Sequence, residues 1–226
     1  MKITNSLKES IAKFISTKTL KIEPIIVDPE VYYIHPVITC RFNKDLVVGS
    51  TDLQSKIKNA VSQYSSNDLE NFSKNFLYSR FLEKINYSDS SILSSFVEYK
   101  VGYRIPSNIG EKQNILCYFG NEISSGSLFS TSFSYFKDGV VNRDCKLKDV
   151  DGNVAIVSSN GSVLVSSVGT IDYKKGIVKF EITVSEYVNY VEILVETENK
   201  DFIASNNTVL KIDNSNINIA LIDSGS

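Results

Sequence analysis

The chain has 226 residues, of which 42% are hydrophobic and 22% are charged, and its formal net charge is -2. This composition is ordinary for globular proteins, and the length suffices for two small cores. A charge so close to zero produces no field that attracts nucleic acid or anionic lipid, so neither is expected as a partner. No apolar run approaches the ~18 residues of a membrane helix, and the start MKITNSLKES lacks the apolar region of a signal peptide. We therefore expect a soluble chain.

The N-terminal segment predicts a short amphipathic helix. Ser6 to Glu9 has the form of a capping box, in which a serine and a glutamate satisfy backbone donors at a helix start. An apolar stripe then repeats at helical spacing: Leu7, Ile11, Phe14 and Ile15. The helix should end near Thr17, and residues 1–24 form this helix and a linker. The stripe is a candidate partner contact, and the chain's own sheet is the alternative surface for it.

Residues 25–105 predict an α+β domain. VYYIHPVITCRF at 31–42 and FVEYKVGYRI at 96–105 alternate as half-buried strands do, while the residues between them have helical spacing. Pro36 lies inside the first strand and removes a ladder donor, so that strand should lie at an edge there or carry a bulge.

Two helices are expected between these strands. The first starts at a capping box, Thr51 to Gln54, and ends at residues 65–67. Ser79 can cap the second helix, whose inner residues include Leu82 and Ile85.

Residues 106–226 predict an antiparallel β domain. Short β-branched or aromatic runs are separated by turn signals: Asp138-Gly139, Asp151-Gly152, Asn160-Gly161 and Lys175-Gly176. The runs at 209–212 and 217–222 form either a last strand or a strap across a neighbour. The fold class is thus α+β, a strand-helix-helix-strand unit followed by an antiparallel β domain with a C-terminal strap.

Catalytic chemistry finds little support in the sequence. His35, the one histidine, sits in mid-strand as a packed or rim residue, and no G-x-S-x-G elbow surrounds any serine. The strand parity of five glutamates places them on a solvated face: Glu181, Glu186, Glu192, Glu196 and Glu198. We expect no enzyme, no catalytic residue and no small-molecule substrate.

Metal and cofactor sites are not expected either. The segment from Asp149 to Asn153 fails the order of a calcium loop and reads as an Asp-Gly hairpin. Cys40, Cys117 and Cys145 are too widely spaced for paired zinc ligands, and we expect reduced thiols, with Cys40 in the core. The glycines form no phosphate-binding loop.

One run of unusual composition is a second candidate contact. In SSGSLFSTSFSYF, residues 124–136, hydroxyl side chains alternate with aromatic ones. Aromatics that one small domain cannot bury would favour a protein partner, through Phe129, Phe133 and Tyr135. An ordinary core strand is the alternative.

Three segments, in order, resemble a known family. They are IVDPEVYYI at 26–34, YSRFLEKI at 78–85 leading to SSI at 90–92, and GTIDYKKGIV at 169–178. Together they resemble the C-terminal part of the large baseplate wedge subunits of T-even-type contractile phages, relatives of the baseplate J-like group. The resemblance spans roughly residues 20 to 220.

This resemblance implies a structural virion protein of the tail baseplate that is assembled in the host cytoplasm. Its implied partners are a second copy of itself and other wedge proteins, in a ring around the tail hub. The alternative function is a glycan- or receptor-binding β module of a phage tail or surface fibre. An enzyme acting on cell-wall sugars would need two facing carboxylates about 5–10 Å apart, and the sequence indicates no such pair.

Overall fold

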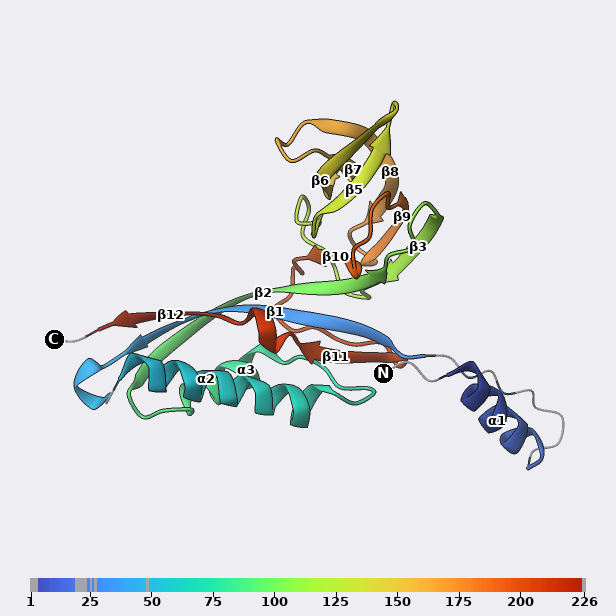
Figure 1. Cartoon of the computed structure of the whole chain (residues 1–226). Coiled ribbons are helices and arrows are strands. Elements are labelled where there is room, and N and C mark those ends of the chain that lie inside the picture. Colours follow the sequence, from blue (N-terminus) through green and yellow to red (C-terminus); the bar gives the residue numbers. More distant parts are fainter. Residues whose placement is uncertain (1–3, 19–23, 25, 27, 48, 225–226) are drawn as a thin grey trace. The chain divides into compact units, whose positions relative to one another are not determined.

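The computed structural model describes residues 4–18, 24, 26, 28–47 and 49–224 (Figure 1). The chain divides into two compact units, Met1–Glu30 and Val31–Ser226. Few helices accompany a mixed sheet of 12 strands, so the fold is α+β with mostly β content, as predicted.

The first unit contains α1 (Asn5–Ser16). Its N-cap is Thr4, whose hydroxyl accepts a hydrogen bond from the Leu7 N–H at 3.4 Å. The predicted Ser6–Glu9 capping box is therefore wrong, because Thr4 caps the helix two residues earlier and leaves Ser6 inside its first turn. The predicted end near Thr17 is confirmed, since Thr17 is the C-cap.

After α1, the next element in the sequence is β1, which begins at Glu30, the last residue of the first unit. The helices are α2 (Ser50–Tyr64) and α3 (Tyr78–Asn86), and the short helical turns are η1 (Lys44–Leu46), η2 (Ser65–Leu69) and η3 (Asn214–Asn216). The strands are β1 (Glu30–Phe42), β2 (Ile92–Pro106), β3 (Lys112–Tyr118), β4 (Phe129–Ser130), β5 (Phe133–Lys137), β6 (Val140–Val150), β7 (Asn153–Val157), β8 (Val163–Asp172), β9 (Ile177–Thr183), β10 (Tyr190–Val195), β11 (Thr208–Ile212) and β12 (Asn218–Asp223). Their order is β11-β1-β2-β10-β4-β6-β7-β8-β9-β3, with β12 also beside β1 and β5 beside β6.

The core is built on the antiparallel pair β1 and β2. Ile34 lies opposite Val101 and Ile38 lies opposite Val97. Helices α2 and α3 lie under these strands (Figure 1) and contribute buried side chains to the same core: Leu53, Ile57, Val61, Phe81 and Ile85. Cys40 is also buried there, as predicted, and its burial raises the pKa of its thiol to about 11.

Both helices of the second unit begin without a side-chain cap. The N-cap of α2 is Gly49 and that of α3 is Leu77, so the predicted caps at Thr51 and Ser79 are wrong. A distant residue instead satisfies one donor of α3, since the Tyr78 N–H donates to Asp201 Oδ1 at 2.8 Å. Tertiary packing of the buried stripes therefore decides where these helices start.

Pro36 lies in a strand that has neighbours on both sides, so β1 is not an edge strand. The Asp213 N–H donates to the Ile34 carbonyl, which places the backbone groups of Ile34, and of Pro36 two residues later, on the side of β11 and β12. There, η3 interrupts the neighbouring chain, and β12 begins its pairing at Val37. Pro36 has no backbone N–H, and it lies where no described residue of a neighbouring strand is paired with β1 on that side, so no ladder hydrogen bond is lost. The register shift in β1 occurs at Arg41/Phe42 instead.

The predicted hairpin turns are confirmed by backbone angles. Asp138 and Gly139 have φ values of 51° and 80°, and Asp151 and Gly152 have values of 50° and 82°. Positive φ at both central residues matches the twist of the flanking strands, which explains the Asp-Gly pairs. At Gly176 a Cβ would lie 2.1 Å from the Asn121 carbonyl oxygen, so that turn admits only glycine.

The C-terminal runs pair with the chain's own first strand. β11 lies next to β1, and β12 runs parallel to β1 from Val37↔Asn218 to Phe42↔Asp223. Both belong to the second unit, Val31–Ser226.

We predict that limited proteolysis will locate the domain boundary expected near residue 106. Early cuts should fall at 106–113 or 124–127, because Asn108, Gly110, Ser125 and Gly126 lie in exposed connections. β1 should resist, since strands flank it on both sides. Mass spectrometry of the first fragments will map the cuts, and early cleavage inside residues 31–42 would contradict this partition.

Candidate functional site

A charged cluster centred on Arg104 joins four segments of the second unit. Arg104 on β2 donates from Nε to Glu192 Oε1 at 3.0 Å and from Nη2 to Asp213 Oδ2. Its guanidinium carbon lies 3.8 Å from the ring centre of Tyr33 and 4.6 Å from that of Tyr190. Stacking between two aromatic rings while bridging two carboxylates uses the planar geometry of arginine, which lysine does not have.

Glu192 corrects the prediction that it lies on a solvated face. Its exposed fraction is 3%, and the successive residues 191–195 of β10 are all buried, so both faces of this strand are covered. The burial is compensated by hydrogen bonds: Glu192 Oε1 also lies 2.9 Å from His35 Nε2, and the Glu192 N–H donates to Thr131 Oγ1 at 2.9 Å. The cluster thus contains the chain's one histidine in a packed position.

Gly102 makes room for this cluster. A Cβ at that position would lie 2.6 Å from Glu192 Oε1 and 2.8 Å from His35 Nε2. Sequence reasoning missed the cluster, yet a signal was present, since a glycine inside a strand pattern often marks a close approach of other groups. No motif or residue spacing in the sequence pointed to Arg104 or Asp213 as members of a cluster.

Asp213 anchors the chain between β11 and β12. Burial works to raise its pKa, but hydrogen bonds from Ser215 and Arg104 outweigh burial and lower it. Asp213 also accepts from Asn216 Nδ2 at 3.1 Å and caps η3. The ion pair with Arg104 therefore fixes the turn that leads into β12.

We predict that Arg104→Met will lower the free energy of unfolding by about 3–5 kcal/mol, because the buried Glu192 and the partly buried Asp213 lose their cation. The Asp213 carboxylate, whose pKa is lowered by folding, stabilises the fold above its ordinary pKa, and that contribution is lost as the pH falls through the folded value. The variant should therefore lose less stability on acidification than the unmodified chain. Urea unfolding at a series of pH values measures both effects.

Arg143→Met is the matched control for this substitution. The Arg143 side chain is 71% exposed and pairs with Glu186 at 2.6 Å, so its loss should cost about 0–1 kcal/mol. Equal destabilisation by the two substitutions would contradict a structural role for the Arg104 cluster.

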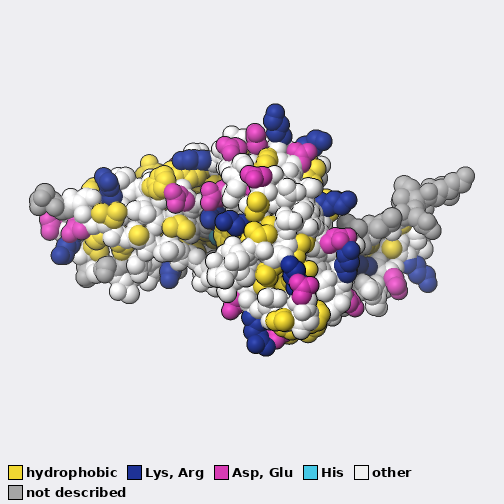
Figure 2. Space-filling view, turned by 90° about the horizontal axis from the view of Figure 1, so that it is seen from above, with side chains coloured by type: hydrophobic (Ala, Val, Ile, Leu, Met, Phe, Trp, Pro, Cys, Tyr) yellow, Lys and Arg dark blue, Asp and Glu magenta, His cyan; other side chains and the backbone are white. Residues whose placement is uncertain are grey.

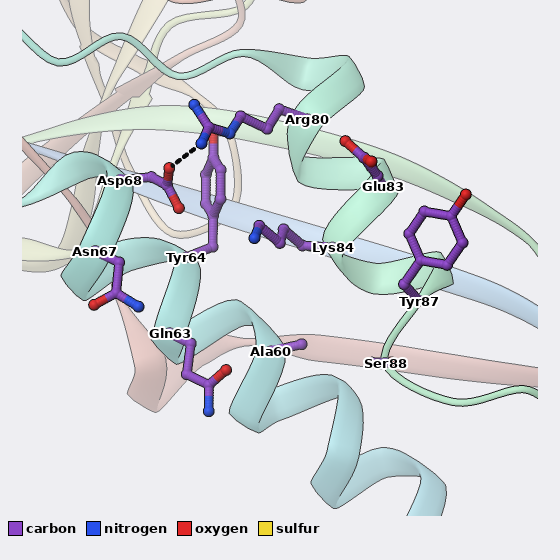
Figure 3. Close-up of a pocket in the computed structure, with 10 residues that line it drawn as sticks. All are labelled: Ala60, Gln63, Tyr64, Asn67, Asp68, Arg80, Glu83, Lys84, Tyr87 and Ser88. Atoms are coloured by element: carbon purple, nitrogen blue, oxygen red, sulfur yellow. Dashed lines mark ion pairs between the residues drawn. The ribbon is translucent and has the colours of Figure 1, made fainter.

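A polar groove lies on the outer side of α2 and α3 (Figure 3). Its volume is about 500 Å³, and Asp68 and Arg80 point toward one another there, with 3.0 Å between Oδ1 and Nη2. Tyr64 lines the groove, and burial raises the pKa of its phenol. Basic and acidic side chains alternate along the groove, which favours a polar protein contact over an anion site.

The structure separates the predicted contact residues into two groups. On α1, Leu7 is 51% and Phe14 is 65% exposed, while Ile11 and Ile15 are half-buried. In the serine-aromatic run, Phe133 is buried in the core, whereas Phe129 and Tyr135 are half-buried. The burial of Phe133 fits the alternative of a core strand, and the two groups are not brought into one site.

Metal-ligating side chains do not gather in the part of the chain that the structure describes. Within it, no three side chains of the types His, Cys, Asp or Glu gather closely enough to hold a metal ion. Its helices also include none with the length and apolar character needed to span a membrane.

Part of the chain matches a known protein family. Residues 30–102 match the family model of baseplate structural protein gp6, C-terminal domain III. The matched segment starts with β1, includes α2 and α3, and ends at Gly102 on β2. No curated protein matches the chain.

The resemblance to the C-terminal part of a baseplate wedge subunit is thereby confirmed for this segment. Three residues of the charged cluster, or in direct contact with it, lie inside the gp6 domain III match: Tyr33, His35 and Gly102. Arg104, Glu192 and Asp213 lie outside it. The domain III segment is therefore joined to the rest of its unit through the cluster.

Proposed function

We propose that this chain is a structural component of a phage baseplate wedge, which assembles through protein contacts into the ring around the tail hub of a contractile phage. The observation that carries the proposal is the gp6 domain III match over residues 30–102. This segment is the strand-helix-helix-strand unit on which the core is built. Its place of action is the virion, after assembly in the host cytoplasm.

The chemistry of the described residues supports a scaffold role. The buried carboxylate of Glu192 pairs with Arg104, which also pairs with Asp213 and so bridges strands. On the face seen in Figure 2, basic side chains are interspersed with acidic ones, which suits contacts with other proteins better than contacts with a polyanion. We propose a non-enzymatic protein whose partners are itself and other wedge proteins, without nucleic acid, membrane or small-molecule substrate.

We predict that the chain will co-assemble with other baseplate wedge proteins of the same phage. Sedimentation velocity of the mixture should show a complex heavier than any component, because a wedge subunit works by holding neighbours in place. Glycans from the host surface serve as the control ligand and should leave the sedimentation unchanged. Glycan binding without any co-assembly would contradict the proposal and favour a receptor-binding module.

We predict that the stripe on α1 is an intermolecular contact. Ile11→Asp with Phe14→Asp should weaken self-association and leave the melting temperature of the monomer nearly unchanged, because α1 has no fully buried residue. Full burial of each such side chain is worth about 1.5–3 kcal/mol, enough for a few residues to contribute to an interface.

Lys13→Asp with Ser16→Asp is the control, since both side chains are exposed on the same helix but lie outside the stripe. Sedimentation and thermal unfolding distinguish the outcomes. A lowered melting temperature with unchanged association would place the stripe in the chain's own core and refute the prediction.

A further inference from the structure

The outer edge of β12 presents backbone N–H and C=O groups that are available for pairing with another strand. β12 pairs with β1 on one side, and no other strand is hydrogen-bonded to it within the described chain. The Ser224 N–H donates to the Phe42 carbonyl, so the even-numbered residues of β12 direct their backbone groups toward β1. The N–H and C=O groups of Ile219 and Leu221 therefore point to the outer edge.

This edge lacks lysine, proline and a bulge, and the one charged residue of β12 is Asp223 at its end. Exposed edge strands are commonly blocked by lysine, proline or a bulge, because they otherwise recruit other strands. The sequence of β12, NIALID, contains no lysine or proline, and its pairing with β1 shows no register shift.

The neighbouring sheet surface exposes apolar side chains among polar ones. On the face away from the helices, Ala220, Thr39 and Phe96 lie in one row across β12, β1 and β2. Phe96 is 50%, Val37 is 43% and Ile222 is 45% exposed. Figure 2 looks onto this side of the molecule and shows hydrophobic side chains exposed at the end that carries β12.

We propose that β12 pairs antiparallel with β12 of a second copy, which joins the two sheets into one. The proposal rests on the proposed scaffold function and assigns one of its contacts. If both copies keep their helices on the same side, opposed residues have the same parity. A two-fold axis at Ala220 then places Ile219 opposite Leu221 of the second copy, and Leu221 opposite its Ile219.

The pattern of backbone groups agrees with this register. In an antiparallel ladder, pairs that exchange two hydrogen bonds alternate with pairs that exchange none. Ile219 and Leu221 have outward backbone groups and form the bonded pairs, while Ala220 is bonded to β1 and meets its copy without hydrogen bonds. Centring the axis on Leu221 instead would place the Asp223 carboxylate opposite Ile219 inside the ladder, whereas the axis at Ala220 places it opposite Ile217, which precedes the strand.

Self-complementarity favours a second copy over a different protein. Two-fold contacts require one surface to match itself, and with this axis the central pairs on the helix-covered face are apolar on both sides, since Ile219 lies opposite Leu221. Ile219 and Leu221 already pack partly against the core, so they are held in position before a partner binds.

Charge exchange at Ala220 tests the pairing in the full chain. Ala220 is exposed, so Ala220→Asp and Ala220→Lys should leave the monomer folded, which circular dichroism checks. Each variant alone places like charges opposite one another and should weaken self-association at least about fivefold. Native mass spectrometry of an equimolar mixture should show heterodimers in excess of the statistical proportion.

Ser94→Asp is the matched control. Ser94 is exposed on β2, which lies on the far side of β1 from β12, so edge pairing should tolerate the change. Unchanged association of both Ala220 variants with statistical mixing, or a monomeric unmodified chain, would overturn the edge proposal. Either result would leave co-assembly with wedge proteins as a separate test of the proposed function.

Discussion

Arg104 holds together segments that are far apart in the sequence. It connects β2 to Glu192 on β10 and to Asp213 between β11 and β12, and His35 on β1 approaches the same glutamate. Burying these charges is costly unless each one is paired and hydrogen-bonded. The pairing therefore constrains where β10 and the C-terminal strands lie against β1 and β2. Gly102 is part of the same constraint, because any side chain there would collide with the cluster.

A second buried carboxylate acts in a similar way in the β-rich part. Asp149 is 5% exposed and accepts from the Tyr173 hydroxyl at 2.8 and 2.9 Å and from the Gly126 N–H at 2.7 Å. It thereby ties β6 to the turn after β8 and to the segment before β4. In the segment that superficially resembled a calcium loop, Asp149 thus serves to fix a hairpin, and its two carboxylate oxygens accept from internal donors.

The buried carboxylates of Glu192 and Asp149 both hold segments of the fold together, which agrees with a structural role for the chain. The gp6 domain III match covers the unit in which two helices back a sheet. On the opposite face of that sheet, Val37, Phe96 and Ile222 are exposed, and no second described strand pairs with the outer edge of β12. The GTIDYKKGIV segment has a structural explanation too: a Cβ at Gly169 would lie 2.0 Å from the Lys179 carbonyl oxygen, so this position requires glycine where β8 meets β9.

Local patterns in the sequence determined the elements that depend on local physics. Alternation predicted the strands around Ile34 and Val101, helical spacing predicted α2, and the Asp-Gly pairs predicted turns whose backbone angles are positive. Periodicity and turn angles are properties of neighbouring residues, so a single chain reveals them. The family resemblance over residues 30–102 was also visible in the sequence.

Only the tertiary structure decided the partners of each strand. The parity of Glu192 suggested a solvated residue, but residues 191–195 of β10 are buried on both faces of the strand. The start of α3 depends on Asp201, which is distant in the sequence, and Pro36 is tolerated because η3 interrupts the neighbouring chain. The sequence by itself determined that α2, the strands around Ile34 and Val101 and the Asp-Gly turns would form. Burial, capping and ion pairing depended on long-range contacts, which the spacing of residues along one chain does not encode.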